Sequence, residues 1–368
     1  MLSSLLLAAL VPYETLCNKH ALSALYRTVE LSPQGIRGCS NYGALETSID
    51  LGILEPCYVD ATTFIAVVKS LPPKQEVALR VEQGSLSWKC VAGEEKKGGK
   101  KATSGASGKL ATLALEHEVP SVPARRRSNK SWTPTEAFKK ALELGSLSCD
   151  QKSLSTIGMD GVVLDNRDGF EVYSSDNVTI SQALVWGESL AQAPESITFS
   201  PESIKLLRVV IGDQKGLIEF DKNGLYYSNS VHRLLIKRTA PLEHDYAKVA
   251  TNFSSEEVCV PIAPERIKAF VQRATAMSEA KRGTTVSIGA KNGRLVISFK
   301  EGTATSDEYY LIDEELEVPD LSPIALDASK LARAMQHIDT AVLDHMEDGV
   351  LKLRGEKPEF RYIISSKR

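Results

Sequence analysis

Apolar and polar residues follow one recurring order along the chain, and residues 55–90 show it most clearly. A short apolar strand leads to Asp60, which is placed to cap a helix because its carboxylate can accept from a free amide of the first turn. Two prolines at 72–73 end that helix, since proline has no amide donor. Alternating residues in 77–81 and 86–88 then predict two strands joined by a tight turn. The apolar face of the helix is predicted to be Phe64, Val67, Val68 and Leu71.

The same order of strand, helix and strands returns five more times. Residues 196–227 and 323–354 repeat it fully, 134–175 and 258–299 repeat most of it, and the N-terminus holds a weaker version. Such internal repetition decides an architecture before any single motif does. We therefore predict an α+β fold of three domains, each with two units, with the boundaries 1–122, 131–249 and 250–368.

The N-terminal apolar stretch has two interpretations. Residues 2–16 are rich in leucine and alanine, which also describes the core of a signal peptide, but they lack a basic leading region and a clear cleavage site. The interpretation we favour is a short buried helix that ends near Pro12. No apolar run of about 20 residues is present to span a membrane.

Composition narrows the class of protein. The chain has a formal net charge of −3 and 42% hydrophobic residues, which is typical of a soluble globular protein. Six cysteines are present without a CxxC pair, which favours buried reduced thiols in a cytosolic protein over disulfides or zinc. They are Cys17, Cys39, Cys57, Cys90, Cys149 and Cys259.

The distribution of charge is more informative than its sum. Four of the predicted helices carry lysine or arginine away from their apolar stripe. On any one helix this is ordinary for a solvated face, but four equivalent helices with the same pattern favour a common anionic partner. The cations are Lys139, Lys140, Lys205, Arg208, Arg266, Arg273, Lys330 and Arg333.

Two further basic segments have simpler explanations. Residues 91–108 are rich in Gly, Ser and Lys and predict a flexible hairpin extension, although their lysines could contact phosphate. Residues 120–132 contain Arg125-Arg126-Arg127 and are predicted to be an interdomain linker.

No catalytic motif is present. The sequence lacks a Gly-rich phosphate loop, HExxH and GxSxG. His244 and Asp245 are adjacent, but neighbouring side chains on a strand point to opposite faces. We therefore expect no enzyme activity, no metal and no cofactor.

The six units, with cations on their helices, resemble the bacterial-type DNA sliding clamp, the β subunit of DNA polymerase III. Four segments carry the resemblance in the family's order. Residues 20–49 resemble its first strand pair, and 58–88 its most regular segment. VYSSDNVTI at 172–180 stands where the family has a Thr-Asp-Gly-His turn, and HDYAKV at 244–249 where it has a Pro-x-Tyr segment.

The resemblance implies a homodimeric ring in the cytoplasm of a bacterium, or of a phage-infected host. Antiparallel sheets would lie outside, helices would line a central channel, and duplex DNA would pass through without sequence preference. The eight cations above would face the DNA. Short peptide tails of the polymerase and the clamp loader would bind an apolar groove between the second and third domains. By position this groove is Met159, Ser175, Asn177, Val178, Ile180, Thr251, Val350, Ile363 and Ser365.

The chain departs from the family at this groove. Val178 and Thr179 stand where the family has histidine and arginine, and the C-terminus is Ser-Ser-Lys-Arg instead of Met-Pro-Met-Arg. The strand that normally precedes the first helix is also missing. A different peptide, such as that of a phage polymerase, is therefore expected. The alternative is a clamp-like decoy or scaffold that captures peptides without encircling DNA.

Overall fold

The structure is a computed structural model that divides into two compact units. Unit 1 comprises Met1–Pro134, Ala191–Ala193 and Glu202–Arg238, and unit 2 comprises Thr135–Leu190, Pro194–Pro201 and Thr239–Arg368. The residues described are 1–17, 19–91, 95–97, 100–102, 106–124, 131–149, 161–166, 170–176, 178–185, 196–212, 215–221, 223–241, 260–279, 283–311, 320–336, 341–347, 350–355 and 359–365.

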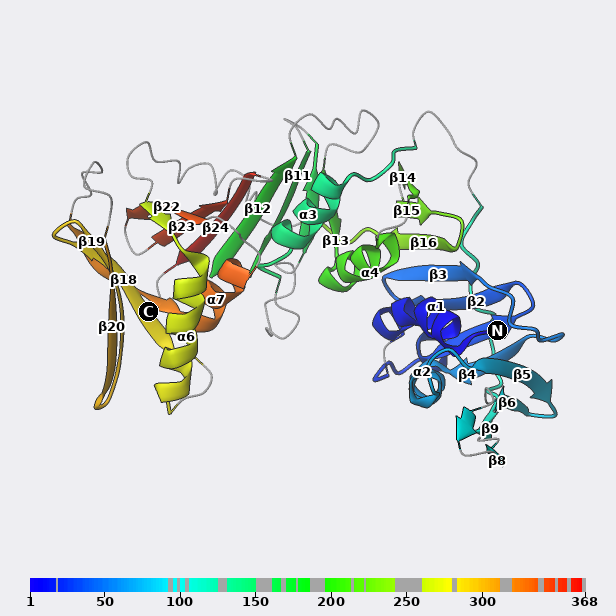
Figure 1. The fold of residues 1–368 in the computed structure, drawn as a ribbon. Helices are drawn as coiled ribbons and strands as arrows, with labels where there is room; N and C mark the ends of the chain where they lie inside the picture. The colour runs from blue at the N-terminus through cyan, green and yellow to red at the C-terminus, as the bar shows by residue number, and fades with distance from the viewer. Residues whose placement is uncertain are drawn as a thin grey trace. The chain divides into compact units, whose positions relative to one another are not determined.

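Unit 1 is built on a seven-stranded antiparallel sheet in the order β14-β15-β16-β3-β2-β1-β4 (Figure 1). A three-stranded sheet, β5-β6-β9, and a two-stranded ribbon, β7-β8, complete its strands. Helices α1 and α2 pack against each other, and α1 lies on β2 and β3. The strands are β1 (Thr28–Ser32), β2 (Gly35–Ser40), β3 (Gly43–Ser48), β4 (Cys57–Asp60), β5 (Glu76–Glu82), β6 (Ser85–Val91), β7 (Glu95–Lys97), β8 (Lys100–Ala102), β9 (Ser107–Ala111), β14 (Leu217–Asp221), β15 (Gly224–Ser228) and β16 (His232–Lys237). The helices are α1 (Ser3–Leu16), the 3-10 helix η1 (Ala24–Arg27), α2 (Ala61–Ser70) and α4 (Pro201–Ile211), which belongs to unit 1 from Glu202 onward.

The prediction for residues 55–90 is confirmed by β4, α2, β5 and β6. Asp60 Oδ1 accepts hydrogen bonds from Thr63 N and Thr63 Oγ1, both at 2.8 Å, and so caps α2. The predicted apolar face needs one change. Val67 is only half-buried, and Ile65 is buried in its place.

The prediction that the first helix ends near Pro12 is wrong. Helix α1 continues through Pro12 to Leu16. Proline deprives the helix of one internal hydrogen bond, but the turn that follows is held by burial, since Tyr13 and Leu16 are fully buried. Gly38 on β2 makes room for this packing, because a Cβ there would lie 2.9 Å from the Tyr13 ring.

The other face of this sheet is covered by the segment that leaves β9. Cys39 and Ala44 form a buried cluster with Val119, Val122 and Tyr226. Cys39 is next to Gly38, which faces α1, so the cluster lies on the opposite face. Helix α1 and this segment therefore cover opposite faces of the sheet at β2 and β3.

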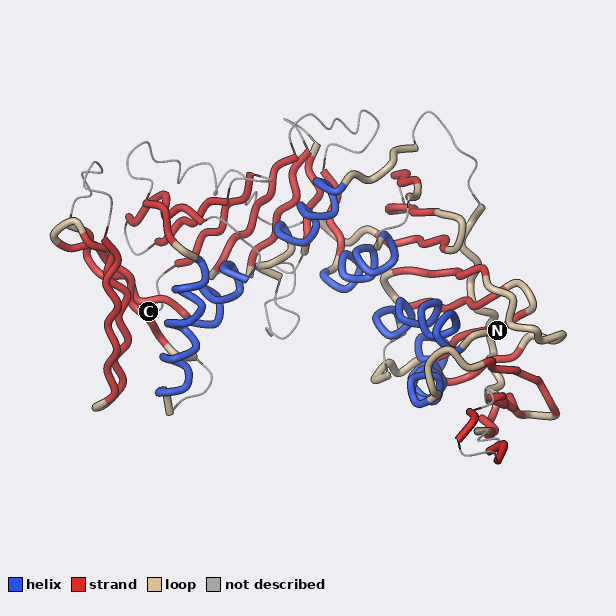
Figure 2. The backbone as a smooth tube through the Cα atoms, in the orientation of Figure 1, coloured by secondary structure: helices blue, strands red, loops and turns tan. Residues whose placement is uncertain are grey.

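Unit 2 contains an eight-stranded sheet in the order β13-β10-β11-β12-β24-β23-β22-β17 and a four-stranded sheet in the order β20-β19-β18-β21. Figure 2 shows β18, β19 and β20 as a long twisted ribbon of strands. The strands are β10 (Val162–Asp165), β11 (Phe170–Ser175), β12 (Thr179–Val185), β13 (Ser196–Phe199), β17 (Val260–Ile262), β18 (Thr285–Lys291), β19 (Arg294–Glu301), β20 (Ala304–Leu311), β21 (Leu321–Asp327), β22 (Ala341–Glu347), β23 (Val350–Gly355) and β24 (Glu359–Ser365). The helices are α3 (Glu136–Gly145), α6 (Pro264–Met277) and α7 (Ala328–Gln336).

Helices α3 and α7 lie on the same face of the eight-stranded sheet. Ser174 Oγ and Ser181 Oγ both donate to Gly145 O at the end of α3, at 2.6 and 2.8 Å. Helix α7 packs on β24, and Arg333 Nη1 donates to Leu147 O at 3.2 Å, just beyond α3. Side chains in register with Ser174 and Ser181 therefore point toward the helices, and their neighbours along each strand point away.

The described chain holds six α-helices, one for each predicted unit. Both large sheets cross the predicted domain boundaries, since β16 pairs with β3 and β12 pairs with β24. The division into three domains at 122 and 249 stays a prediction. Of the cysteines, Cys17, Cys39, Cys57 and Cys90 are buried free thiols, Cys149 is a half-buried one, and Cys259 lies outside the described residues.

Candidate nucleic-acid interface and partner groove

Helix α4 carries two of the predicted cations on an exposed face. Its buried face contains Ile204, Leu207 and Ile211, as the periodicity predicts. Lys205 and Arg208 are exposed on another face, one turn apart, which places both charges on one stripe of the helix. This stripe has the character needed to contact a polyanion.

The lysines of α3 are held by carboxylates of the same helix. Thr135 caps α3 by accepting from Phe138 N at 3.1 Å. Lys139 Nζ lies 2.7 Å from Glu136 Oε1, and Lys140 Nζ lies 3.0 Å from Glu143 Oε2. Each of these lysines therefore has a carboxylate neighbour on its own helix.

Helix α6 carries two of the predicted cations, and both are exposed. Ile267, Phe270, Val271 and Ala274 form the buried face, as predicted. Arg266 is exposed near the start of the helix. Arg273 forms an ion pair with Glu308 of β20, and its guanidinium lies 5.7 Å from the centre of the Phe270 ring.

The two cations of α7 are directed into the protein. Lys330 forms an ion pair with Asp176, and only 19% of its side chain is exposed. Arg333 donates to Leu147 O, as noted above. Leu331 and Met335 are buried as predicted, whereas Ile338 lies outside the described residues.

The predicted groove residues that the structure describes gather at one end of adjacent strands. β11, β12 and β24 pair Ser175 with Ile180 and Ile180 with Ile363. Ser365 N donates to Val178 O at 2.9 Å, and Ser365 pairs with Val350 of β23. Ile180, Ile363 and Ser365 alternate along their strands with Ser181, Tyr362 and Ile364, which point toward the helices. The groove residues therefore lie on the face opposite α3 and α7.

This end of the sheet is partly apolar and partly open. Val178 is 38% exposed, whereas Ile180 is 9% and Ile363 is 4% exposed. Met159, Asn177 and Thr251 complete the predicted groove but lie outside the described residues. Sequence reasoning did not include Lys352, which pairs with Ile363 and is buried.

The Asp176 carboxylate organises the turn between β11 and β12. Its Oδ1 accepts from Val178 N at 3.1 Å, from Thr179 N at 2.7 Å and from Thr179 Oγ1 at 2.8 Å. Its Oδ2 accepts from Lys330 Nζ. The DNA-facing role of Lys330 stays a prediction. Helical periodicity could not show that its side chain meets a carboxylate 154 residues away.

Comparison with known proteins decides what fold this is. No known protein-family profile matches the sequence, and no curated protein of similar sequence was found. Among solved structures, the DNA polymerase III subunit beta of Pseudomonas aeruginosa superposes with a TM-score of 0.76 at 15% identity, covering 100% of this chain and 99% of that one. The chain has the sliding-clamp fold.

Two other structures agree. The DNA polymerase sliding clamp of Caulobacter crescentus gives a TM-score of 0.75 at 12% identity, covering 100% of this chain and 98% of that one. The beta subunit from the DNA polymerase of Streptococcus pyogenes gives 0.75 at 15% identity, covering 100% and 99%. The fold predicted from the six units is thus confirmed over the full length, with sequences that have diverged widely.

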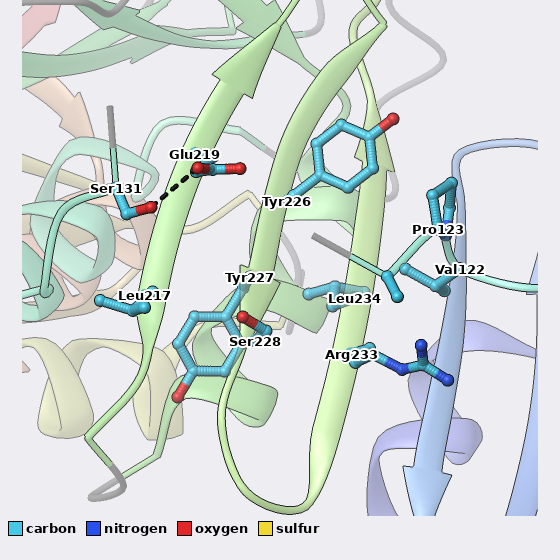
Figure 3. Close-up of a pocket in the computed structure, with 11 residues that line it drawn as sticks. Val122, Pro123, Ser131, Leu217, Glu219, Tyr226, Tyr227, Ser228, Arg233 and Leu234 are labelled. Atoms are coloured by element: carbon cyan, nitrogen blue, oxygen red, sulfur yellow. Dashed lines mark hydrogen bonds between the residues drawn. The ribbon is translucent and has the colours of Figure 1, made fainter. Parts of the chain in front are cut away.

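Two pockets of the described residues lie in unit 1. One, of about 90 Å³, is lined by Val122, Tyr226, Tyr227, Leu234 and others (Figure 3). It lies beside the described residues of the predicted linker, 120–124 and 131–132, and both of these parts are anchored. Val122 N donates to Glu46 Oε1 at 2.9 Å, and Ser131 Oγ donates to Glu219 Oε1 at 2.7 Å. This volume is small for an organic ligand, so we interpret the pocket as a packing gap where the linker residues contact the sheet.

The described residues show no metal cluster, and their buried thiols are free. They contain no group of three or more His, Cys, Asp or Glu side chains placed to hold a metal. Burial raises the pKa of the Cys17 thiol to about 12 and that of Cys57 to about 11, which keeps these thiols protonated at neutral pH. In the same described part of the chain, no helix is long and apolar enough to cross a membrane.

Proposed function

We propose that this chain is a DNA sliding clamp. Two copies close into a ring around duplex DNA and tether a replicative polymerase in the cytoplasm. The observation that carries the proposal is the match to DNA polymerase III beta structures over the whole length of both chains. In this role the protein catalyses no reaction and needs no cofactor.

Open sheet edges support ring closure by a second copy. Strand β20 is at the edge of the four-stranded sheet in unit 2, and β9 is at the edge of the three-stranded sheet in unit 1. Edge strands present unpaired backbone groups that readily pair with another chain. Thr305, Asp307 and Tyr309 of β20 are exposed. We propose that β20 of one copy pairs with β9 of its partner.

The cations support contact with DNA that has no sequence preference. Lys205, Arg208 and Arg266 are exposed on two helices. Contacts from such side chains to phosphates are electrostatic, salt-dependent and compatible with sliding. Durable retention then depends on ring closure and not on affinity.

The candidate groove supports the proposal that this chain binds peptides of partner proteins. Val178, Ile180, Val350 and Ile363 offer apolar side chains beside the polar Ser175 and Ser365. Such a row suits a short peptide of mixed character, as in the tail of a polymerase or clamp loader. The substitutions at Val178 and Thr179 favour a peptide different from that of the family.

Two experiments test the proposal: the mass of the protein in solution, and its retention on circular compared with linear DNA. Light scattering over a concentration series is expected to give twice the 40.1-kDa chain mass. Protein assembled on nicked circular DNA by a clamp loader is expected to co-elute with the DNA and to be lost once the circle is cut. A monomer at every concentration, or equal retention on cut and uncut DNA, would contradict the proposal.

A second candidate is a clamp-like module that binds peptides without encircling DNA. One observation favours it: Lys139, Lys140, Arg273 and Lys330 are each paired with a carboxylate of the chain itself. A strict monomer that still binds peptide would support this second function.

A further inference from the structure

The ion pair between Asp176 and Lys330 joins a strand turn of the eight-stranded sheet to helix α7. Asp176 belongs to the turn between β11 and β12, and Lys330 belongs to α7. The Asp176 side chain is 1% exposed, and that of Lys330 is 19% exposed. A charged group removed from water to this extent is costly to bury unless a cation or several hydrogen-bond donors compensate it.

The two oxygens of Asp176 have different partners. Oδ1 accepts from the backbone amides of Val178 and Thr179 and from the Thr179 hydroxyl. Oδ2 accepts from Lys330. The lysine therefore supplies the charge, and the amides supply the geometry that fixes the turn.

The pair also links the two faces of the eight-stranded sheet. Helix α7 lies on the face toward which Tyr362 and Ile364 point. Val178 is beside Ser365 and belongs to the opposite face, which carries the candidate groove. Lys330 reaches from the helix side to the turn whose amides hold Val178 in place.

We infer that Asp176 and Lys330 form a positioning unit for the partner-peptide groove. Lys330 neutralises the buried carboxylate, and the carboxylate holds the Val178 side of the groove. Lys330 then acts in peptide binding and not in DNA contact. This inference rests on the proposed function for the peptide, whereas the order of the turn is independent of it.

A variant that removes the charge of Lys330 tests whether the lysine holds the turn at Asp176. In Lys330→Met the buried carboxylate loses its cation, so the turn that it holds is destabilised and loosens. Lys330→Arg keeps the charge. Lys205→Met is the matched control, because it removes the same charge from an exposed position of α4.

Hydrogen exchange measured by mass spectrometry reads the turn directly. In Lys330→Met we expect exchange in residues 176–181 to become at least tenfold faster, with β18 and β19 unchanged. Lys330→Arg should restore most of the protection, and Lys205→Met should change nothing there. Exchange as slow as in the unmodified chain, or acceleration spread equally through β18 and β19, would overturn the inference.

Binding assays then separate this inference from the proposed function. The probes are a fluorescein-labelled octapeptide with leucine and phenylalanine side chains, matched to the apolar row, and a 30-base-pair duplex. We expect Lys330→Met to weaken peptide binding at least fivefold and leave duplex binding unchanged. Lys205→Met should do the reverse. Loss of duplex binding in Lys330→Met equal to that in Lys205→Met would refute the inference, whereas no peptide binding by the unmodified chain would refute only the proposed groove.

Discussion

The exposed cations of α4 give the sharpest quantitative test of DNA contact. Lys205 and Arg208 are exposed, and they lie away from the buried side chains of the helix. The double variant Lys205→Ala/Arg208→Ala therefore removes two charges without opening the core. A suitable control is Lys291→Ala/Lys300→Ala, which removes the same charge from exposed strand positions of unit 2.

The magnitude follows from counterion release. If each side chain contacts one phosphate in each copy, a ring of two copies loses four contacts. The slope of log K against log salt then falls by about 3.6, since each phosphate contact contributes about 0.9. Between 50 and 200 mM salt that difference corresponds to a factor of about 150 in affinity.

Fluorescence anisotropy with a 30-base-pair duplex, repeated at several salt concentrations, measures this slope. The control should keep the slope of the unmodified chain, because its lysines are on strands and not on the helix stripe. An unchanged slope in the α4 variant would refute the assignment of these residues to the DNA interface. An equal decrease in the control would show that net charge matters and position does not.

Three predictions concern stability, each measured by urea unfolding. Burial lowers the pKa of His232 below its ordinary 6.5, so the unfolded chain binds the proton more readily than the folded chain. The free energy of unfolding is therefore expected to fall as the pH drops below about 6.5. His232→Gln should abolish that part of the decline. Asp60→Ala should cost about 1 kcal/mol through loss of the α2 cap, whereas Asp60→Asn, which keeps an acceptor, should cost much less. Gly145→Ala should cost about 2 kcal/mol, because the new Cβ would lie 2.3 Å from Val172 O and force α3 away from β11; an unchanged midpoint would mean that α3 shifts freely.

Local sequence patterns predicted the helices and strands well, because the turns and caps that bound them depend on residues close by in the sequence. The turn at Gln83-Gly84 has Gly84 at a positive φ of 68°, as a tight turn requires, and the cap at Asp60 needs only a neighbour three residues away. Pro12 was mispredicted because its cost is offset by tertiary burial of Tyr13 and Leu16, which no local rule contains. Val67 and Ile65 are equally apolar, so only the packing of α2 could choose between them.

The candidate site was harder to predict because it is assembled from distant strands. The groove residues come together through the registers of β11 with β12 and of β12 with β24. The second register pairs Ile180 with Ile363, far apart in the sequence. The resemblance supplied those positions, and the structure brings the described ones together. The cations were predicted from helical periodicity alone. Periodicity separates inside from outside, but it cannot show that Arg273 meets Glu308 or that Lys330 meets Asp176.

The pairing of β3 with β16 also constrains how the protein is made. Strand β3 ends at Ser48, and its partner β16 starts at His232, so synthesis must continue for more than 180 residues before that edge is covered. At about 5–20 residues per second, the unpaired strand waits roughly 10 to 40 seconds on the ribosome. The edge of β12 waits for β24, the last strand of the chain. Each large sheet is thus completed late, and a chain that stops before residue 359 would release β12 with an open edge suited to aggregation.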